Sequence, residues 1–263
     1  AAGDPEGKKT EERVFTDRVL LEVPILAMGA GGGPLIDLAG VLTGQSDKFF
    51  GSTTVGANRN LVKITKSKAF PKNVEVAFEM PDRRGQLVTI HYSISEIPEK
   101  GSYQPREADA RVGFFTTSYR DLSRNDKDTQ WVRYVNRWQI EKRDPKLKMS
   151  PPKQAIVFYI DSATPVQYRR WVREGVLAWN KAFEKVGIVE AIQVVQQDST
   201  TGEHTDKDPE DVRYNFIRWT SAGLGFAIGP SRVHPETGQI LDADVVLDDG
   251  FIRGWSRSYQ QLV

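Results

Sequence analysis

The sequence contains no cysteine, and this absence excludes three kinds of site at once. Disulfide frameworks, thiolate zinc sites and cysteine nucleophiles all need a residue that the chain does not have. No apolar run approaches the roughly 18 residues of a membrane span, so we expect no span in this chain. The first residues, Ala1-Ala2-Gly3-Asp4, are neither an initiator methionine nor a signal peptide, and we expect both ends to be cut.

The chain also lacks an excess of charge of either sign. Thirty-six basic residues face thirty-five acidic ones, and the formal charge is +1. Such a balance provides no field that would attract a polyanion, so we expect no nucleic-acid partner. Charged residues make up 27% and hydrophobic ones 39%, which is typical of a globular protein rather than of a disordered one.

Histidine is scarce too, with three residues in the whole chain: His91, His204 and His234. Their separations match no compact zinc motif, such as two histidines one helical turn apart. A surface or hydrogen-bonded role is therefore the better interpretation for His91 and His204. No Gly-x-Ser-x-Gly elbow occurs, and Ser231 has only His234 near it, which argues against serine hydrolysis.

What the chain does contain, up to about residue 143, is a series of short apolar stretches separated by turn residues. This pattern predicts a β-rich region, with a hairpin across residues 81–85. A proline-marked basic stretch at 144–152 predicts a domain boundary, which gives domains 1–148 and 149–263. The predicted strands are 19–28, 60–64, 73–80, 87–94, 112–119 and 131–140.

The second region predicts a strand, a long helix and then several more strands, so the expected fold class is α+β. The unbroken apolar run 155–160 indicates a strand buried on both faces. Thr164 is the expected N-cap of the helix, Pro165 its first residue, and Gly187 its left-handed end. Further strands are expected at 192–196, 214–219, 225–229 and 240–247, and an amphipathic segment at 251–263.

Three local patterns leave their chemistry open. The glycine run 28–34 lacks the Gly-Lys-Ser/Thr of a phosphate loop, so we interpret it as a flexible surface loop. Asp242 and Asp244 share a face if 240–247 is one strand, and could serve as a glycosidase pair, as calcium ligands or as the wet side of the strand. The acidic stretch 206–211 lacks the spacing of an EF-hand loop, which favours a solvated loop.

Longer ordered matches point to one family. The segments 111–121, 135–138 and 141–145 resemble the middle region of large bacterial zinc-dependent metalloproteases, a region whose own role is uncharacterised. The resemblance continues through the segments 158–161, 178–183, 211–215, 229–232 and 237–244, and spans roughly residues 14 to 260.

The resemblance implies a β-rich accessory domain followed by the upper part of a metzincin-like catalytic domain, with a mixed sheet backed by a long helix. It implies zinc as cofactor, bound by a His-Glu-x-x-His helix after Val263, so this chain should be inactive alone. It further implies a secreted or periplasmic protein, a peptide or protein substrate, and an edge strand that pairs with that substrate. The implied substrate-binding residues are Leu224, Gly225, Phe226, Ala227, Ile228 and Gly229.

Two alternatives stay open beside this interpretation. Related matrixin-type proteases carry structural metals near the edge strand, but this chain has Phe226 there and no edge-strand histidine, so structural zinc is not expected. Calcium at Asp242 or Asp244 is the cation that the sequence still allows. The rival function is a non-catalytic scaffold that binds peptides or other domains and never carries zinc.

Overall fold

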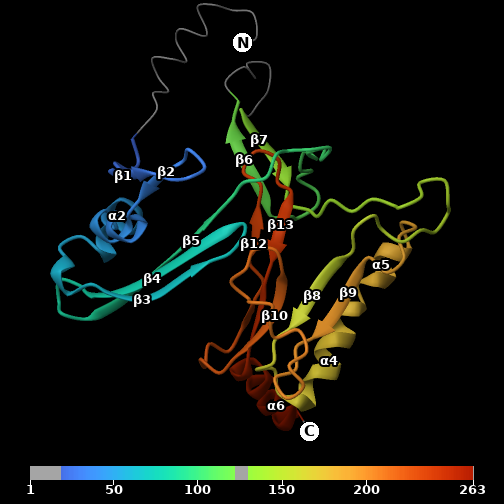
Figure 1. Ribbon diagram of the computed structural model, residues 1–263. Helices are drawn as coiled ribbons and strands as arrows, with labels where there is room; N and C mark the ends of the chain where they lie inside the picture. The colour runs from blue at the N-terminus through green and yellow to red at the C-terminus, as the bar shows by residue number, and fades with distance from the viewer. Residues whose placement is uncertain (1–18, 122–129, 263) are drawn as a thin grey trace, which may run out of the picture. The chain divides into compact units, whose positions relative to one another are not determined.

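The computed structural model describes residues 19–121 and 130–262 (Figure 1). The chain forms two compact units, residues 1–96 and 97–263. This division lies at Glu96 and Ile97, well before the boundary predicted at 148/149. Helices and several sheets are both present, so the α+β fold class is confirmed.

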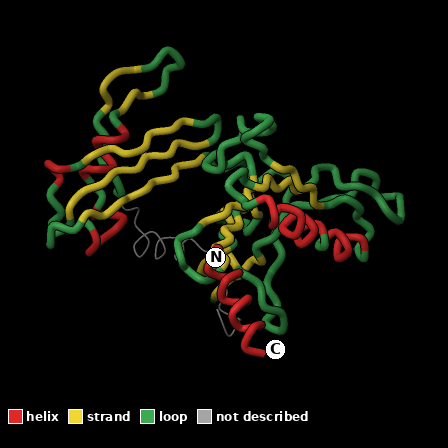
Figure 2. Tube along the Cα trace, turned by 90° about the horizontal axis from the view of Figure 1, so that it is seen from below, coloured by secondary structure: helices red, strands yellow, loops and turns green. Residues whose placement is uncertain are grey.

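The first unit is built on an antiparallel sheet of order β3-β4-β5, whose three strands lie side by side in Figure 2. Its strands are β3 (Lys63–Ala69), β4 (Asn73–Pro81) and β5 (Leu87–Ser95). The predicted hairpin is confirmed, because Pro81 pairs with Leu87 across the turn and Gly85 adopts the positive φ that such turns need. One face of the sheet carries the core residues Val76, Phe78, Met80, Ile90 and Tyr92, with Leu42 packed on them.

Short elements precede this sheet. They are β1 (Ile25–Met28), β2 (Pro34–Ile36), α2 (Leu38–Gly44), α3 (Asp47–Phe50) and the 3-10 turns η1 (Gly51–Thr53) and η2 (Arg59–Leu61). The glycine run is the exposed turn of a hairpin: β1 and β2 pair antiparallel, and Gly29 N donates to Gly33 O at 2.8 Å. The run is therefore a tight hairpin turn, which needs glycine at Gly32, where φ is +77°.

The second unit is built on a five-stranded mixed sheet of order β11-β14-β10-β8-β9. Its strands are β8 (Ile156–Ile160), β9 (Ile192–Gln196), β10 (Asn215–Thr220), β11 (Ala227–Ile228) and β14 (Val245–Asp248). The pairs within β14, β10, β8 and β9 are all parallel, whereas β11 runs antiparallel to β14. The strand predicted at 155–160 is confirmed, and Ile156 and Ile160 are both buried.

The predicted long helix lies alongside β8 and β9 as two pieces, α4 (Val166–Leu177) and α5 (Asn180–Glu184) (Figure 1). Val172, Val176 and Phe183 pack against the core of the sheet. The predicted cap at Thr164 is wrong, because Pro165 is the N-cap and no side chain caps the first turn. Gly187 has the expected left-handed φ of +82°.

Residues 97–148 belong to the second unit because their backbone pairs with later segments. They contain the antiparallel hairpin of β6 (Thr116–Arg120) and β7 (Trp131–Val135). After it, Arg137 N donates to Gly238 O at 3.0 Å, and Ile240 N donates to Arg137 O at 2.9 Å. These contacts join positions about one hundred residues apart, which no local composition signal announces.

The predicted strand 240–247 is two strands, β13 (Ile240–Ala243) and β14, which have different partners. β13 pairs with β12 (Ser231–Val233), whereas β14 lies inside the five-stranded sheet. Asp244 stands between them. The amphipathic segment predicted at 251–263 forms α6 (Asp249–Leu262), which begins directly after β14.

Candidate functional site

The six residues predicted to bind substrate lie at the outer edge of the five-stranded sheet. Ala227 and Ile228 form β11, which pairs with Leu247 and Val246 of β14. Leu224, Gly225 and Phe226 lead into this strand, and Gly229 follows it. All six are exposed. Because β11 is the last strand in the sheet order, its main chain has a strand partner on one side only.

A buried carboxylate holds the segment that enters β11. Asp248, at the end of β14, is 1% exposed and accepts hydrogen bonds from the main-chain N–H of Gly225 at 3.0 Å and of Gly250 at 2.9 Å. These bonds lower the pKa of the Asp248 carboxyl, with the bond from Gly225 contributing most, while burial acts in the opposite direction. One side chain therefore joins the edge segment to the first turn of α6.

Glycine is required where these segments approach each other. A side chain at Gly250 would place its Cβ 2.7 Å from the Asp248 carboxylate and 3.1 Å from the main-chain N of Gly225. Gly223 and Gly225 both have φ of +72°, a conformation that other residues rarely adopt. The shape of the edge segment thus follows from its glycines and from one aspartate.

The opposite edge of the same sheet is closed by side chains from the helices. Asn180 donates to Ile192 O at 2.9 Å and accepts from Ile192 N at 2.8 Å. Arg173 donates to Val194 O at 2.5 Å. These three contacts occupy main-chain groups of β9 that a further strand would need.

Asp242 and Asp244 do not form a free pair. Asp242 makes an ion pair with Arg232 at 2.7 Å, and Asp244 accepts from Phe216 N at 2.8 Å. Burial raises the pKa of Asp244 to about 6, against the bond from Phe216, and the nearby Asp242 raises it further. Burial also raises the pKa of Asp242, which Arg232 opposes. Asp242 thus links β13 to β12, and Asp244 binds the main chain of β10. These contacts support a structural role for both carboxylates.

The three histidines contact different residues. His91 contacts the buried Glu75 at 2.8 Å on the sheet of the first unit. His234 is buried, and its Nδ1 accepts from Glu236 N at 3.2 Å. His204 has a φ of +57°, and its ring lies 6.0 Å from that of Tyr159.

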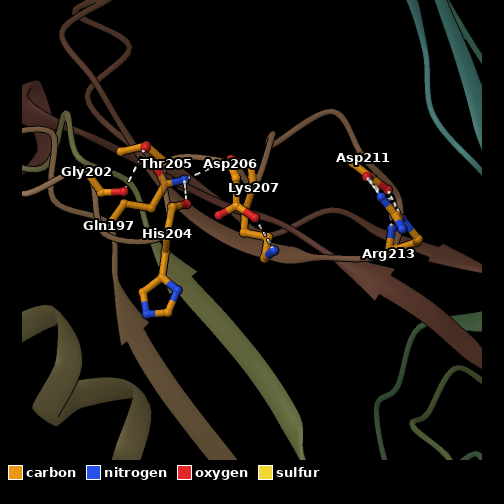
Figure 3. A network of polar contacts seen from close by, with 8 residues as sticks. All are labelled: Gln197, Gly202, His204, Thr205, Asp206, Lys207, Asp211 and Arg213. Atoms are coloured by element: carbon orange, nitrogen blue, oxygen red, sulfur yellow. Dashed lines mark hydrogen bonds and ion pairs between the residues drawn. The ribbon is translucent and has the colours of Figure 1, made fainter.

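The acidic stretch 206–211 is part of a network of polar contacts within its own loop (Figure 3). Gln197 donates to the main-chain oxygens of His204 and Lys207, at 2.9 and 2.8 Å, while the ring of His204 points away from these contacts. Asp211 forms an ion pair with Arg213, whose guanidinium donates to both carboxylate oxygens. These bonds order the loop without gathering its carboxylates around one point.

An apolar cavity of about 350 Å³ lies between the sheet and its helices. Trp138, Trp179 and Phe183 line it together with aliphatic residues of β8, β9, β10 and β14. Its walls contain no charged side chain. The cavity therefore offers volume for an apolar group but no acid, base or ligand for chemistry.

Across residues 19–121 and 130–262, no group of three or more His, Asp or Glu side chains is arranged to hold a metal ion. The zinc expected from the resemblance therefore has no fitting site among these residues, and neither does the calcium considered at Asp242 or Asp244. In the same ranges, no helix combines the length and the apolar character needed to cross a membrane.

Two residues that organise the sheet edges were not predicted as such. Asp248 precedes Asp249-Gly250 at the start of α6, so its N-cap position was a signal available in the sequence. Asn180 had no such signal, because its role depends on the packing of α5 against β9.

One family model, described as a domain of unknown function (DUF5117), matches residues 2–143, which is more than half of the chain. The match ends close to the boundary predicted at 148/149, although the compact units divide earlier. No curated protein and no solved structure matches the chain.

Proposed function

The chain belongs to the DUF5117 family, and we propose that its parent protein is a zinc-dependent metalloendopeptidase that hydrolyses peptide bonds. In this proposal residues 149–263 are the upper part of a metzincin-like catalytic domain, and the parent protein is secreted or periplasmic. The zinc ligands follow Val263, so this chain alone is inactive.

The observation that carries the proposal is the open edge strand of a mixed sheet. Beside four parallel strands lies one short antiparallel strand, β11, whose two residues are exposed and which has a strand partner on one side. An extended peptide binds to such an edge through main-chain hydrogen bonds, which hold it straight without reading its sequence. Fixing the peptide in this way is what an endopeptidase needs from this side of its cleft.

The chemistry of cleavage is not assigned to any residue of this chain. The described residues hold no fitting zinc site, and the metal when bound would activate water and polarise the peptide carbonyl. The part assigned to this chain is to bind and orient the substrate, with Asp248 keeping the edge segment in shape.

The same edge supports a second candidate function, a non-catalytic scaffold that binds peptides or other domains. Main-chain pairing at β11 needs no metal, so this function requires nothing beyond the described residues. The two candidates differ only in whether zinc ligands come after the sheet.

The test is peptide hydrolysis measured together with bound zinc, on this chain and on the chain extended through the next segment of its own gene. Cleavage that a chelator abolishes, seen only in the extended protein, supports the metalloendopeptidase. Absence of both zinc and cleavage from the extended protein overturns it and favours the scaffold.

A further inference from the structure

The two edges of the five-stranded sheet differ in whether they can accept another strand. At β9, Asn180 bonds to the N–H and the C=O of Ile192, and Arg173 bonds to the C=O of Val194. At β11, within the described part of the chain, no side chain bonds to the main chain of Ala227 or Ile228. A sheet that blocks one edge and leaves the other free is arranged to accept a strand at the free edge alone.

The free edge is also uniformly uncharged. Residues 221–230 read Ser-Ala-Gly-Leu-Gly-Phe-Ala-Ile-Gly-Pro, without an acidic or basic side chain. Leu224, Phe226 and Ile228 are 52%, 50% and 51% exposed, and small residues separate them. Ile228 lies in β11 and Phe226 directly before it, so both exposed side chains stand next to any peptide paired with β11.

The edge segment is held in shape before any peptide arrives. The buried Asp248 carboxylate accepts from Gly225, and Gly223 and Gly225 are already in the left-handed conformation. A receptor strand that is already ordered loses little conformational entropy on binding, and this increases affinity.

We infer that the edge segment 224–229 binds extended peptides that carry apolar side chains at alternate positions, in preference to peptides with polar or charged side chains there. This inference rests on the proposed function for the substrate class, but it concerns binding by this chain without zinc. The main chain of β11 provides the pairing, and Phe226 and Ile228 provide the preference.

The experiment measures fluorescence polarisation of labelled ten-residue peptides titrated with this chain in the presence of a chelator. One peptide alternates Leu and Ser, a second alternates Lys and Ser, and a third is the Leu peptide with alternate amides N-methylated. We expect the Leu peptide to bind about tenfold more tightly than either of the others. N-methylation leaves the protein unchanged, so that comparison does not depend on the folding of a variant.

The variants Phe226→Ser and Ile228→Ser locate the site. Each should weaken binding of the Leu peptide several-fold, whereas Val186→Ser, a matched change at a residue that is 66% exposed on another surface, should not. Circular dichroism checks that all three variants fold.

Equal binding of the Leu and Lys peptides overturns the preference, and binding that survives N-methylation or both edge variants overturns the site. If this chain binds the Leu peptide as expected in the presence of a chelator, but the extended chain never cleaves it, the proposed protease function is wrong and this inference stands. If the extended chain has a zinc-dependent cleavage activity but shows no preference for apolar peptides, only this inference is wrong.

Discussion

The two edges of the five-stranded sheet differ in whether side chains bond to their outer main chain. β9 carries polar side chains of α4 and α5 on its outer main chain, whereas β11 carries none within the described residues. β9 is five residues long and β11 two, and side chains bond only to the outer main chain of β9 among the residues that the structure describes. The difference shows that an open edge here is a specific feature of the molecule and not simply the place where the sheet ends.

The largest expected effect comes from opening the closed edge at Asn180. Asn180→Ala leaves both the N–H and the C=O of Ile192 without their partner, at a residue that is only 8% exposed. We expect the free energy of unfolding to fall by about 2–4 kcal/mol, since an unsatisfied buried group costs about 1–3 kcal/mol. Urea denaturation measures the change.

The control for Asn180 is its neighbour Lys181, which is exposed on the same helix. Lys181→Ala should change the free energy of unfolding by less than about 0.5 kcal/mol. If the two variants are equally stable, the side-chain closure of β9 contributes nothing, and the comparison of the two edges fails.

The next effect concerns the open edge and the carboxylate behind it. Asp248→Asn keeps an oxygen that can accept from Gly225 N and Gly250 N, but it removes the negative charge that these two N–H groups stabilise. The melting temperature at pH 7 should fall, and binding of the Leu peptide should weaken with it. Because the folded pKa of Asp248 is lowered, its stabilisation is present above the unfolded pKa and is lost as the pH falls through the folded pKa.

This acid dependence can be checked by melting both proteins across the acid range. The gap between native chain and Asp248→Asn should close as the pH is lowered. A gap that stays constant would mean that the charge of Asp248 does not hold the edge segment.

How much of this arrangement the sequence predicts depends on whether the signal is local. The hairpin around Gly85 and the buried strand at 156–160 were predicted, because alternation and apolar runs are local patterns. The closure of β9 by Asn180 was not, because it requires α5 to lie against a strand twelve residues later. The prediction that residues 224–229 form a sheet edge came from the family resemblance. A two-residue strand is too short to show a periodic pattern in the sequence.

The compact units differ from the predicted domains 1–148 and 149–263, and the predicted strand 240–247 is two strands, for the same reason. Prolines at 144–152 marked a boundary in composition, but Arg137 pairs with Gly238 and Ile240 and draws the preceding residues into the second unit. Likewise, 240–247 reads as one alternating strand until Asn215 and Phe216 bind the main chain of Ala243 and the side chain of Asp244.

Asp244 provides a smaller effect of opposite sign at the other end of β14. Its folded pKa is raised to about 6 from 3.8, so its contribution to stability is greatest below the unfolded pKa and is lost as the pH rises towards 6. Asp244→Asn keeps an oxygen that can accept from Phe216 and removes the charge. Because the carboxyl is partly solvated, we expect the variant to be about 1 kcal/mol more stable at pH 7.

The measurement is urea denaturation at about pH 4 and at pH 7, where the advantage of Asp244→Asn should be absent and present respectively. Asp244→Asn and Asp248→Asn then distinguish the carboxylates at the two ends of β14, since at neutral pH the first variant should gain stability and the second should lose it. A loss of stability in Asp244→Asn at pH 7 would contradict the raised pKa.

The smallest effect is expected at Arg173, which covers Val194 O at the closed edge. Arg173→Ala should cost about 0.5–1 kcal/mol, since the C=O of Val194 can accept from water once the guanidinium is gone. Its more informative consequence is association: β9 becomes partly open, and edges without a cover pair with other chains. Light scattering during incubation should therefore rise for Arg173→Ala but not for Arg170→Ala, a residue of the same helix whose side chain bonds Glu174 at 2.7 Å and no strand. Equal scattering by the two variants would show that Asn180 alone is sufficient to close this edge.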